Sequence, residues 1–380
     1  MSYRIGITCY PTVGGSGVVA TELGKALAEN GHEVHFITSS VPYRLNECQA
    51  NIFFHEVEVN QYSVFRYPPY DIALASKMAE IAKREKLDIL HVHYAIPHAI
   101  SAYLAKEMVG DHLKVVTTLH GTDITVLGYD PSLKDMIKFG IEKSDIVTAV
   151  SNDLVQQTSL LLQTSKPIET VYNFVDHRVY FPRDATYLKG QLNIEESQKI
   201  IVHVSNFRKV KRVPDVVDAF LKIQEEVDSV LLLIGDGPDL PVVREKVDAL
   251  GISDRVRFLG NQKRVADLLS ISDLKLLLSE KESFGLVILE AMACGVPAIG
   301  SKIGGIPEVI EHGKNGFISS LGNTQEVADF AIRVLTDEEL HESMSTFALK
   351  RANSDFHKGK IVKQYEDIYA KAISLIGELK

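Results

Sequence analysis

The chain has 380 residues, 45% of them apolar and 24% charged, with a formal net charge of −9 and no low-complexity tract. This length exceeds what one hydrophobic core usually supports, so two domains are expected, and the lack of a domain-wide basic excess argues against nucleic acid as a partner. The cysteines Cys9, Cys48 and Cys294 are too widely spaced for a disulfide framework or a zinc pattern, which favours the cytoplasm. No signal peptide precedes the first predicted strand, and no apolar run reaches the roughly 20 residues of a membrane span.

Strand-like and helix-like segments alternate along the whole chain, a pattern typical of α/β folds with parallel sheets. The pattern is interrupted across 165–197, where turn and charged residues dominate, and it then resumes. We therefore expect two similar α/β halves joined by a linker, with a cleft between them. Strands are predicted at 4–10, 33–38, 87–93, 113–119, 146–150, 200–204, 229–234 and 274–278, and helices at 18–30, 214–227, 285–295 and, through an apolar stripe ending at Ile376, 357–380.

Polar side chains follow several of these strands at their carboxyl ends, where open α/β sheets bind ligands. His120 is the most conspicuous of them, although a lone histidine is more often structural than catalytic. The others are His91, His93, Tyr94, Gly121, Thr122, Asp123 and the helix-capping cluster 151–153.

The loop 14–17, Gly-Gly-Ser-Gly, lies between the first strand and the first helix, which is the position of a phosphate-binding loop. Residues 15–20 also fit the dinucleotide fingerprint. The second strand, however, ends without the acidic residue that would hold a ribose diol. An ordinary tight turn remains an alternative.

The stretch 274–295 predicts a buried strand, a polar loop and a helix that is apolar except at Glu290. A carboxylate in such a helix needs a partner, and Glu282 lies eight residues earlier in the loop. The backbone N–H groups around 283–285 would be the free donors of the first helical turn, a natural anion site. The two glutamates and these donors suit a ligand with hydroxyls and phosphates. Alternatively, Glu290 forms a structural salt bridge and Glu282 is solvated.

Four cations fall within the five residues 208–212, just after a strand of the second half. They could neutralise a diphosphate, or they could form a solvated surface. The sequence has neither an Asp-x-Asp nor a His-Glu-x-x-His motif, so no metal is expected, and cationic side chains and helix N-termini would take its place at a leaving phosphate.

Segments 282–297 and 304–308 together resemble the donor signature of the retaining glycosyltransferases of family 4, the large family that contains sucrose-phosphate and mycothiol glycosyltransferases. The resemblance covers essentially the whole chain. It implies the GT-B fold, with two Rossmann-like domains whose parallel sheets face an interdomain cleft, no metal, no cofactor and a homodimer. It implies an acceptor-binding domain at 1–165 plus 357–380, onto which the final helix crosses back, and a nucleotide-sugar domain at 166–356.

Segments 9–22, 91–98 and 119–124 are similar to the branch of this family that acts in bacillithiol biosynthesis. That similarity implies UDP-N-acetylglucosamine (UDP-GlcNAc) as donor and the hydroxyl of L-malate as acceptor, with retention at the anomeric carbon.

Carried over residue by residue, the resemblance gives Glu290 the ribose hydroxyls and Glu282 the hydroxyls of the sugar. Lys211 would neutralise the leaving diphosphate, and His120 would contact the sugar. One departure is Asn206, where the family has arginine; Arg208 supplies that charge, or Lys211 acts alone. The implied catalytic positions are His120, Lys211, Glu282 and Asn206, the donor positions Gly15, Ser16, Arg208, Lys211, Ser283, Phe284, Gly285, Leu286 and Glu290, and the acceptor positions Ser16, Tyr94, Thr122 and Asn152.

Both glutamates already have hydroxyl-binding roles, so no carboxylate pair is left for a double displacement. A front-face mechanism, in which the leaving phosphate accepts the acceptor's proton, needs only positioning and electrostatics. Four alternatives stay open: transfer to another small acceptor, a nucleotide-sugar epimerase or hydrolase on the same fold, a nicotinamide oxidoreductase that uses the Gly15 loop, and a non-catalytic sugar-nucleotide sensor.

Overall fold

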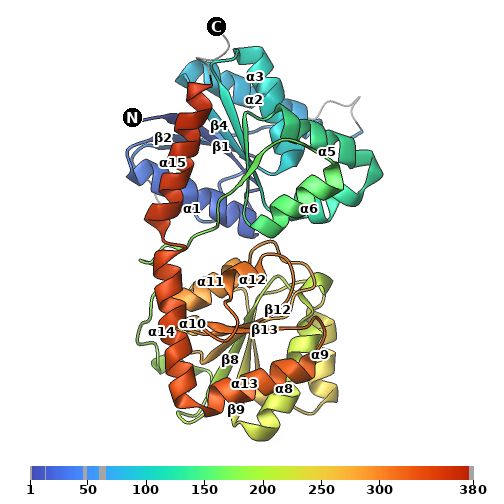
Figure 1. Ribbon diagram of the computed structural model, residues 1–380, viewed down its shortest axis with the longest axis vertical. Helices are drawn as coiled ribbons and strands as arrows, with labels where there is room; N and C mark the ends of the chain where they lie inside the picture. The colour runs from blue at the N-terminus through green and yellow to red at the C-terminus, as the bar shows by residue number, and fades with distance from the viewer. Residues whose placement is uncertain (1, 13, 46–48, 60–65, 376–380) are drawn as a thin grey trace. The chain divides into compact units, whose positions relative to one another are not determined.

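A computed structural model describes residues 2–12, 14–45, 49–59 and 66–375 of the chain, so Cys48 and Ile376 lie outside the described residues. The chain divides into two compact units, Met1–Asn173 with Lys358–Lys380, and Phe174–His357 (Figure 1). Each unit contains one parallel sheet with helices around it, which confirms the predicted α/β class.

The first unit is built on a sheet in the order β3-β2-β1-β4-β5-β6-β7. The order reverses between β1 and β4, and in open α/β sheets ligands bind at the carboxyl edge beside such a reversal. β7 pairs with β6, so the first unit extends past the boundary expected at 165. The strands are β1 Arg4–Thr8, β2 Glu33–Thr38, β3 Ile52–Glu56, β4 Ile89–His93, β5 Lys114–Leu119, β6 Ile146–Ala149 and β7 Ile168–Thr170.

Most helices of the first unit connect successive strands, as parallel pairing requires. The first begins three residues before its predicted start, because Gly14 precedes it as the N-cap and Gly15 and Ser16 already belong to its first turn. The helical segments are α1 Gly15–Glu29, α2 Tyr70–Glu85, η1 Ala95–Ala99, α3 Ile100–Val109, α4 Thr122–Thr125, η2 Leu127–Tyr129, α5 Pro131–Lys143, α6 Asn152–Leu162 and α15 Lys358–Ser374.

The last helix, α15, packs on β5 and α1 of the first unit, although nearly 200 residues separate it from the rest of that unit (Figure 1). Tyr365 and Tyr369 on its inner face are fully buried. The Tyr369 hydroxyl lies 2.7 Å from Nδ1 of His91, and Nε2 of His91 lies 2.7 Å from Oγ1 of Thr118. These hydrogen bonds give the polar groups of the central strands partners inside the core.

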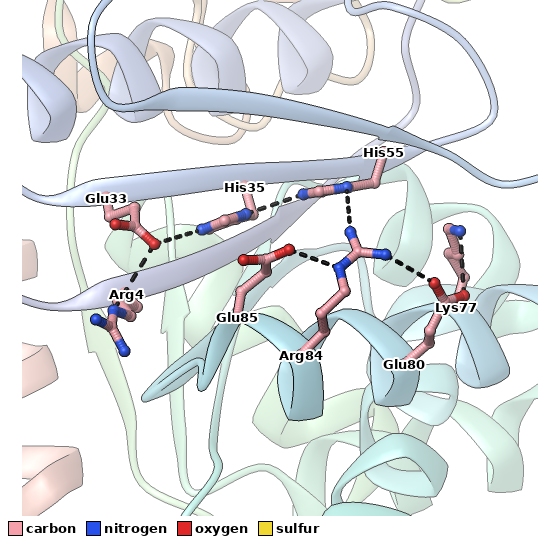
Figure 2. A network of polar contacts seen from close by, with 8 residues as sticks. All are labelled: Arg4, Glu33, His35, His55, Lys77, Glu80, Arg84 and Glu85. Atoms are coloured by element: carbon pink, nitrogen blue, oxygen red, sulfur yellow. Dashed lines mark hydrogen bonds and ion pairs between the residues drawn. The ribbon is translucent and has the colours of Figure 1, made fainter.

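A network of polar contacts joins the edge strand β3 and its neighbour β2 to α2 (Figure 2). Arg84 can only donate, so its contact of 3.4 Å with Nδ1 of His55 makes that nitrogen an acceptor. Neutral His55 then donates from Nε2 to Nδ1 of His35 at 2.9 Å, and His35 donates from Nε2 to Glu33 at 3.0 Å. Burial, followed by the neighbouring charges of His35 and Arg84, lowers the pKa of His55 to about 4. When His35 and His55 are both neutral, only one placement of their ring protons satisfies all of these hydrogen bonds.

The second unit repeats the same plan with the order β10-β9-β8-β11-β12-β13, which reverses between β8 and β11. Its main core includes Leu231 and Leu233 of the sheet together with Phe220 of α8 and Ala331 of α13. The strands are β8 Lys199–Val204, β9 Ser229–Ile234, β10 Val256–Gly260, β11 Leu274–Leu277, β12 Ala298–Ser301 and β13 Gly316–Ser319.

Helices again follow these strands, and the predicted buried helix is observed as α11, which is apolar except at Glu290. The helical segments of this unit are α7 Tyr187–Gln191, η3 Lys209–Lys211, α8 Val213–Glu226, α9 Leu240–Ala249, η4 Ser253–Arg255, α10 Val265–Ser270, α11 Leu286–Ala293, α12 Ile306–Val309, α13 Thr324–Thr336 and α14 Glu338–Ser354.

Replacing Tyr369 by phenylalanine tests how α15 is held. The substitution removes only the hydroxyl and leaves Nδ1 of His91 buried without its partner. We expect the free energy of unfolding to fall by about 1–3 kcal/mol in urea denaturation. The control is Tyr67→Phe, because Tyr67 is 75% exposed and should lose nothing. Equal stability of the two variants would contradict this role for the hydroxyl.

Candidate active site

Most of the predicted donor residues of the second unit lie on the two segments that follow the adjacent strands β8 and β11, and Leu286 and Glu290 lie on α11, directly after the second segment. The two segments contact each other directly. The backbone N–H of Glu280 donates to the carbonyl of Val210 at 2.9 Å, and Nζ of Lys211 lies 2.6 Å from Oε2 of Glu282. The structure therefore brings together two residues for which the sequence predicted separate ligand roles.

The Lys211–Glu282 ion pair is mostly shielded from water, since the two side chains are 20% and 16% exposed. A charge-assisted hydrogen bond in such a position is stronger than a surface pair. Arg212 also has acidic neighbours, Asp215 at 2.6 Å and Glu280 at 3.7 Å. Within the basic segment 208–212, Lys211 and Arg212 therefore pair with carboxylates, whereas the side chain of Arg208 is exposed.

The loop that carries Glu282 is held by its backbone. Gly305 donates its N–H to the carbonyl of Glu282 at 3.1 Å, and a Cβ on Gly305 would lie 2.3 Å from the carbonyl oxygen of Ser283. Gly285, the N-cap of α11, has φ +94°, which favours glycine. The close approach at Gly305 and the positive φ at Gly285 explain why the predicted donor signature has glycine at both positions.

The backbone of the loop after β9 packs closely against the backbone of the loop after β8. A Cβ on Gly237 would lie 2.2 Å from the carbonyl oxygen of Asn206, and one on Gly235 would lie 1.8 Å from that of Ser205. Phe207 has φ +28° although it is not glycine, and its ring is fully buried. The backbone at 205–207 is therefore tightly fixed. The side chain of Asn206, at the position where arginine was expected, extends from it and is exposed.

Glu290 lies on α11 and is only 6% exposed. Lys275, on β11, is fully buried and its charge interacts with that of Glu290. Lys275 was not predicted as a site residue from the sequence. Its single signal was a charged residue in the middle of a run of leucines.

The predicted residues of the first unit lie at the carboxyl ends of β4 and β5. Nε2 of His120 lies 2.8 Å from Nδ1 of His93, and the two rings are stacked. Tyr94 also stacks on the ring of His120, with centroids 5.8 Å apart, and it has φ +93°. Tyr10 in turn contacts the ring of Tyr94. With Nε2 occupied by His93, the Nδ1 side of His120 is the one available to a ligand.

Asp123 was expected at the ligand-binding edge of the sheet but was given no individual role, and in the structure it holds the backbone of this region. Its fully buried carboxylate accepts hydrogen bonds from the N–H groups of Gly121 at 2.9 Å and Ala95 at 3.1 Å. Burial raises its pKa to about 6, while these bonds act in the opposite direction. The sequence Gly-Thr-Asp after a strand was the available signal for this arrangement.

The remaining predicted residues sit at helix starts along the same edge. Gly15 and Ser16 are in the first turn of α1, and Gly17 approaches so closely that a Cβ there would lie 2.4 Å from the carbonyl oxygen of Tyr10. Thr122 begins α4 with an exposed side chain. Asn152 begins α6, but its amide contacts the end of β7, donating to the Tyr172 hydroxyl at 2.9 Å.

Within the described ranges, no group of three or more histidine, cysteine or acidic side chains is arranged to hold a metal ion. In the same ranges, no helix combines the length and the apolar character needed to cross a membrane.

Three buried histidines and the half-buried His120 lie at the first-unit site, and loss of contact with water is the main cause that lowers the pKa of each. The pKa of His91 and of His120 is lowered to about 3, that of His98 to about 4, and that of His93 falls well below its ordinary value of 6.5. In the unfolded chain these histidines take up protons near 6.5, whereas in the folded protein they stay neutral.

The free energy of unfolding should therefore decrease as the pH falls below about 6.5, by up to ~1.4 kcal/mol per pH unit for each such histidine. Asp123 has a raised pKa in the folded protein, so its protonation stabilises the fold as the pH falls. This offsets the destabilising effect of only one histidine proton. Urea denaturation at pH 7.5, 6.5 and 5.5 measures the slope. The variant His98→Gln should show a shallower slope, and equal stability at pH 7.5 and 5.5 would contradict the buried neutral histidines.

Comparison with known proteins identifies the family of both units. The family described as Glycosyltransferase Family 4 matches residues 13–179, and the family described as Glycosyl transferases group 1 matches residues 184–351. The chain is 65% identical over 369 residues to the N-acetyl-alpha-D-glucosaminyl L-malate synthase of Bacillus anthracis, covering 97% of both chains. It is 26% identical over 389 residues to an uncharacterised glycosyltransferase of Methanocaldococcus jannaschii, covering 96% of both.

Solved structures show the same fold at lower sequence identity. The chain matches sucrose-phosphate synthase from Thermosynechococcus elongatus with a TM-score of 0.83 and 20% identity, covering 98% of this chain and 100% of the other. It matches the Anabaena protein HepE, crystallised with UDP and glucose, with a TM-score of 0.80 and 21% identity, covering 97% and 99%. The chain therefore has the GT-B fold and belongs to the family 4 glycosyltransferases, enzymes that transfer a sugar.

Proposed function

We propose that this glycosyltransferase moves N-acetylglucosamine from UDP-GlcNAc to the hydroxyl of L-malate, with retention at the anomeric carbon, and so catalyses the first step of bacillithiol biosynthesis. The observation that carries the proposal is the 65% identity, over 97% of both chains, to an N-acetyl-alpha-D-glucosaminyl L-malate synthase. Relatives at this identity and coverage usually keep their substrates, whereas the structural neighbours at about 20% support only the fold.

The proposed donor residues belong to the second unit. Glu290 accepts hydrogen bonds from the ribose hydroxyls, and Glu282 accepts them from the sugar. Lys211 binds the diphosphate, with the backbone N–H groups at the start of α11 and the side chain of Arg208 beside it. The proposal is supported by the contact between the two loops, which keeps a cation and a carboxylate together in a shielded position.

The proposed acceptor residues belong to the first unit. His120 contacts the transferred sugar from the Nδ1 side, since Nε2 is engaged by His93. Ser16, Tyr94 and Thr122 bind the malate carboxylates through hydroxyls, and the first turn of α1 adds backbone donors. Asn152 is a weaker choice than the sequence indicated, because its amide already has partners at the end of β7.

The proposed reaction breaks the bond between the anomeric carbon and the β-phosphate oxygen, and forms a bond from the malate hydroxyl oxygen to the same face of that carbon. The hydroxyl proton passes to the leaving diphosphate, so the products are GlcNAc-α-malate and UDP. Lys211 stabilises the negative charge that develops on the leaving group, which is usually the largest contribution a preorganised site makes. A front-face route needs no carboxylate nucleophile, and none is left over in the proposed assignment.

The proposal includes a reaction that needs neither metal nor cofactor, an enzyme that acts in the cytoplasm and a homodimer. Each of these remains a prediction. A metal requirement can be tested by comparing turnover with magnesium and with a chelator, and the homodimer by sedimentation.

The test of the function is release of UDP from UDP-GlcNAc in the presence of a panel of acceptors. We expect release with L-malate and little without acceptor. UDP release without acceptor would indicate a hydrolase or an epimerase. UDP release with an inositol phosphate or another sugar, and not with L-malate, would identify that compound as the acceptor instead. UDP binding without turnover with any acceptor would indicate a sensor, and binding of nicotinamide cofactor would indicate an oxidoreductase.

Substitution of Lys211 tests the electrostatic part of the proposal. Lys211→Ala removes the cation at the leaving group and should reduce turnover by about 100-fold or more, the scale seen when one preorganised donor is lost. The matched control is Lys209→Ala, in the same short helix but with an exposed side chain, which should stay close to wild type. Circular dichroism checks that both variants fold. Unchanged turnover of Lys211→Ala would refute this role.

A further inference from the structure

The second unit contains a buried lysine that the proposed mechanism does not use. Lys275 lies on β11, in the interior of the sheet between β8 and β12, and none of its surface is exposed. Its Nζ has no hydrogen-bond partner among the described residues. A buried amine without a partner is costly, so its presence in a run of leucines needs an explanation.

The alternation of the strand places Lys275 on the side of α11. Leu274, Leu276 and Leu278 point into the core shared with α8 and α13. Lys275 therefore points from the opposite face of the sheet. The corresponding face of β12 is the one at Gly300, where a Cβ would approach Ile288 of α11. Glu290 is on this same helix and is itself buried.

Three charged or titratable groups act on Lys275 or respond to it. Glu290 favours the charged amine, whereas Lys211 of η3 opposes it. Burial, the largest effect, lowers the pKa of Lys275 to about 7. His203 of β8 is the third group, because the charge of Lys275 contributes to lowering its pKa. Among the described residues, Glu290 is the carboxylate that stabilises the buried cation.

A purely structural role does not explain the amine. A methionine has a similar length, fills the same space and has no polar atom to bury, so packing alone would favour it. What the lysine adds is a positive charge next to a carboxylate that is shielded from water. Without that charge, the carboxylate of Glu290 would be shielded from water and lack this neighbouring cation, and burial disfavours an ionised carboxylate that is left in this way.

We propose that Lys275 is a positioning residue for the nucleotide-sugar donor, acting through Glu290, which it keeps ionised to accept the ribose hydroxyls. The inference rests on the donor-binding role of Glu290 under the proposed function. It adds a residue that never touches the donor but sets the charge of one that does.

The experiment is a double-mutant cycle on the full chain, with UDP release measured across UDP-GlcNAc concentrations. Lys275→Met should raise the KM for UDP-GlcNAc about tenfold and leave kcat within about twofold, because the interaction concerns donor binding. Glu290→Gln should raise the same KM at least as much. The double variant should match Glu290→Gln alone, since no carboxylate then remains for Lys275 to act on. Lys246→Met, which breaks an ion pair with Asp218 away from this site, should leave KM unchanged.

The outcomes separate the inference from the function on which it rests. If Glu290→Gln leaves the KM unchanged, the donor role of Glu290 fails and the inference fails with it. If Glu290→Gln raises the KM but Lys275→Met does not, or if the two effects multiply in the double variant, only the inference is overturned. If Lys275→Met does not fold, the double variant should recover folding, because it removes both buried charges. Failure of that recovery would also overturn the inference.

Discussion

The ion pair between Lys211 and Glu282 is the contact on which the proposed donor site depends. It joins two loops that follow adjacent strands, and both side chains are largely shielded from water. Each charge is costly to leave alone in that position, so in the absence of ligand each stabilises the other. A diphosphate that approaches Lys211 and a sugar hydroxyl that approaches Glu282 would replace one set of charge-assisted bonds by another. The pair therefore keeps both groups charged and placed before the donor arrives.

The fold fixes this contact through backbone packing. Gly305 and Gly237 each allow a neighbouring loop to approach at a distance that a side chain would forbid. The first unit uses a different device at the carboxyl edge of its own sheet, where the carboxylate of Asp123 accepts hydrogen bonds from the backbone N–H groups of Gly121, next to His120, and of Ala95, after β4. In the second unit the joined loops follow β8 and β11, the strands between which the order reverses, whereas in the first unit Asp123 joins loops that follow the neighbouring strands β4 and β5.

Much of the fold could be predicted from the sequence, because its central strands are continuous apolar runs. β2 and β9 have the predicted bounds, and β4, β5 and β8 differ by one or two residues. β3 was missed because its Ile-Phe-Phe-His-Glu sequence at the sheet edge is half exposed and shows no clear alternation. β7 was missed because its three residues are all half-buried and lie in the stretch that was predicted as a linker.

The site was predictable as a set of residues and not as a set of contacts. Glycines, acids and bases near strand ends identify candidate ligand groups, but the pairing of Lys211 with Glu282 joins residues 71 positions apart. Nothing local indicates that pairing. Lys275 shows the same limit: a charged residue in an apolar strand is visible in the sequence, whereas its relation to Glu290 depends on which face of the sheet α11 covers.

The affinity for UDP of the Glu282→Gln variant tests the central claim most directly. UDP carries the diphosphate and the ribose but lacks the transferred N-acetylglucosamine, so it should contact Lys211 and make no use of Glu282. Neutralising Glu282 frees Lys211, and calorimetry should therefore show UDP bound at least as tightly as by the wild type, while sugar transfer falls about 100-fold. A loss of UDP affinity in proportion to the loss of transfer would contradict the separate roles assigned to the two charges.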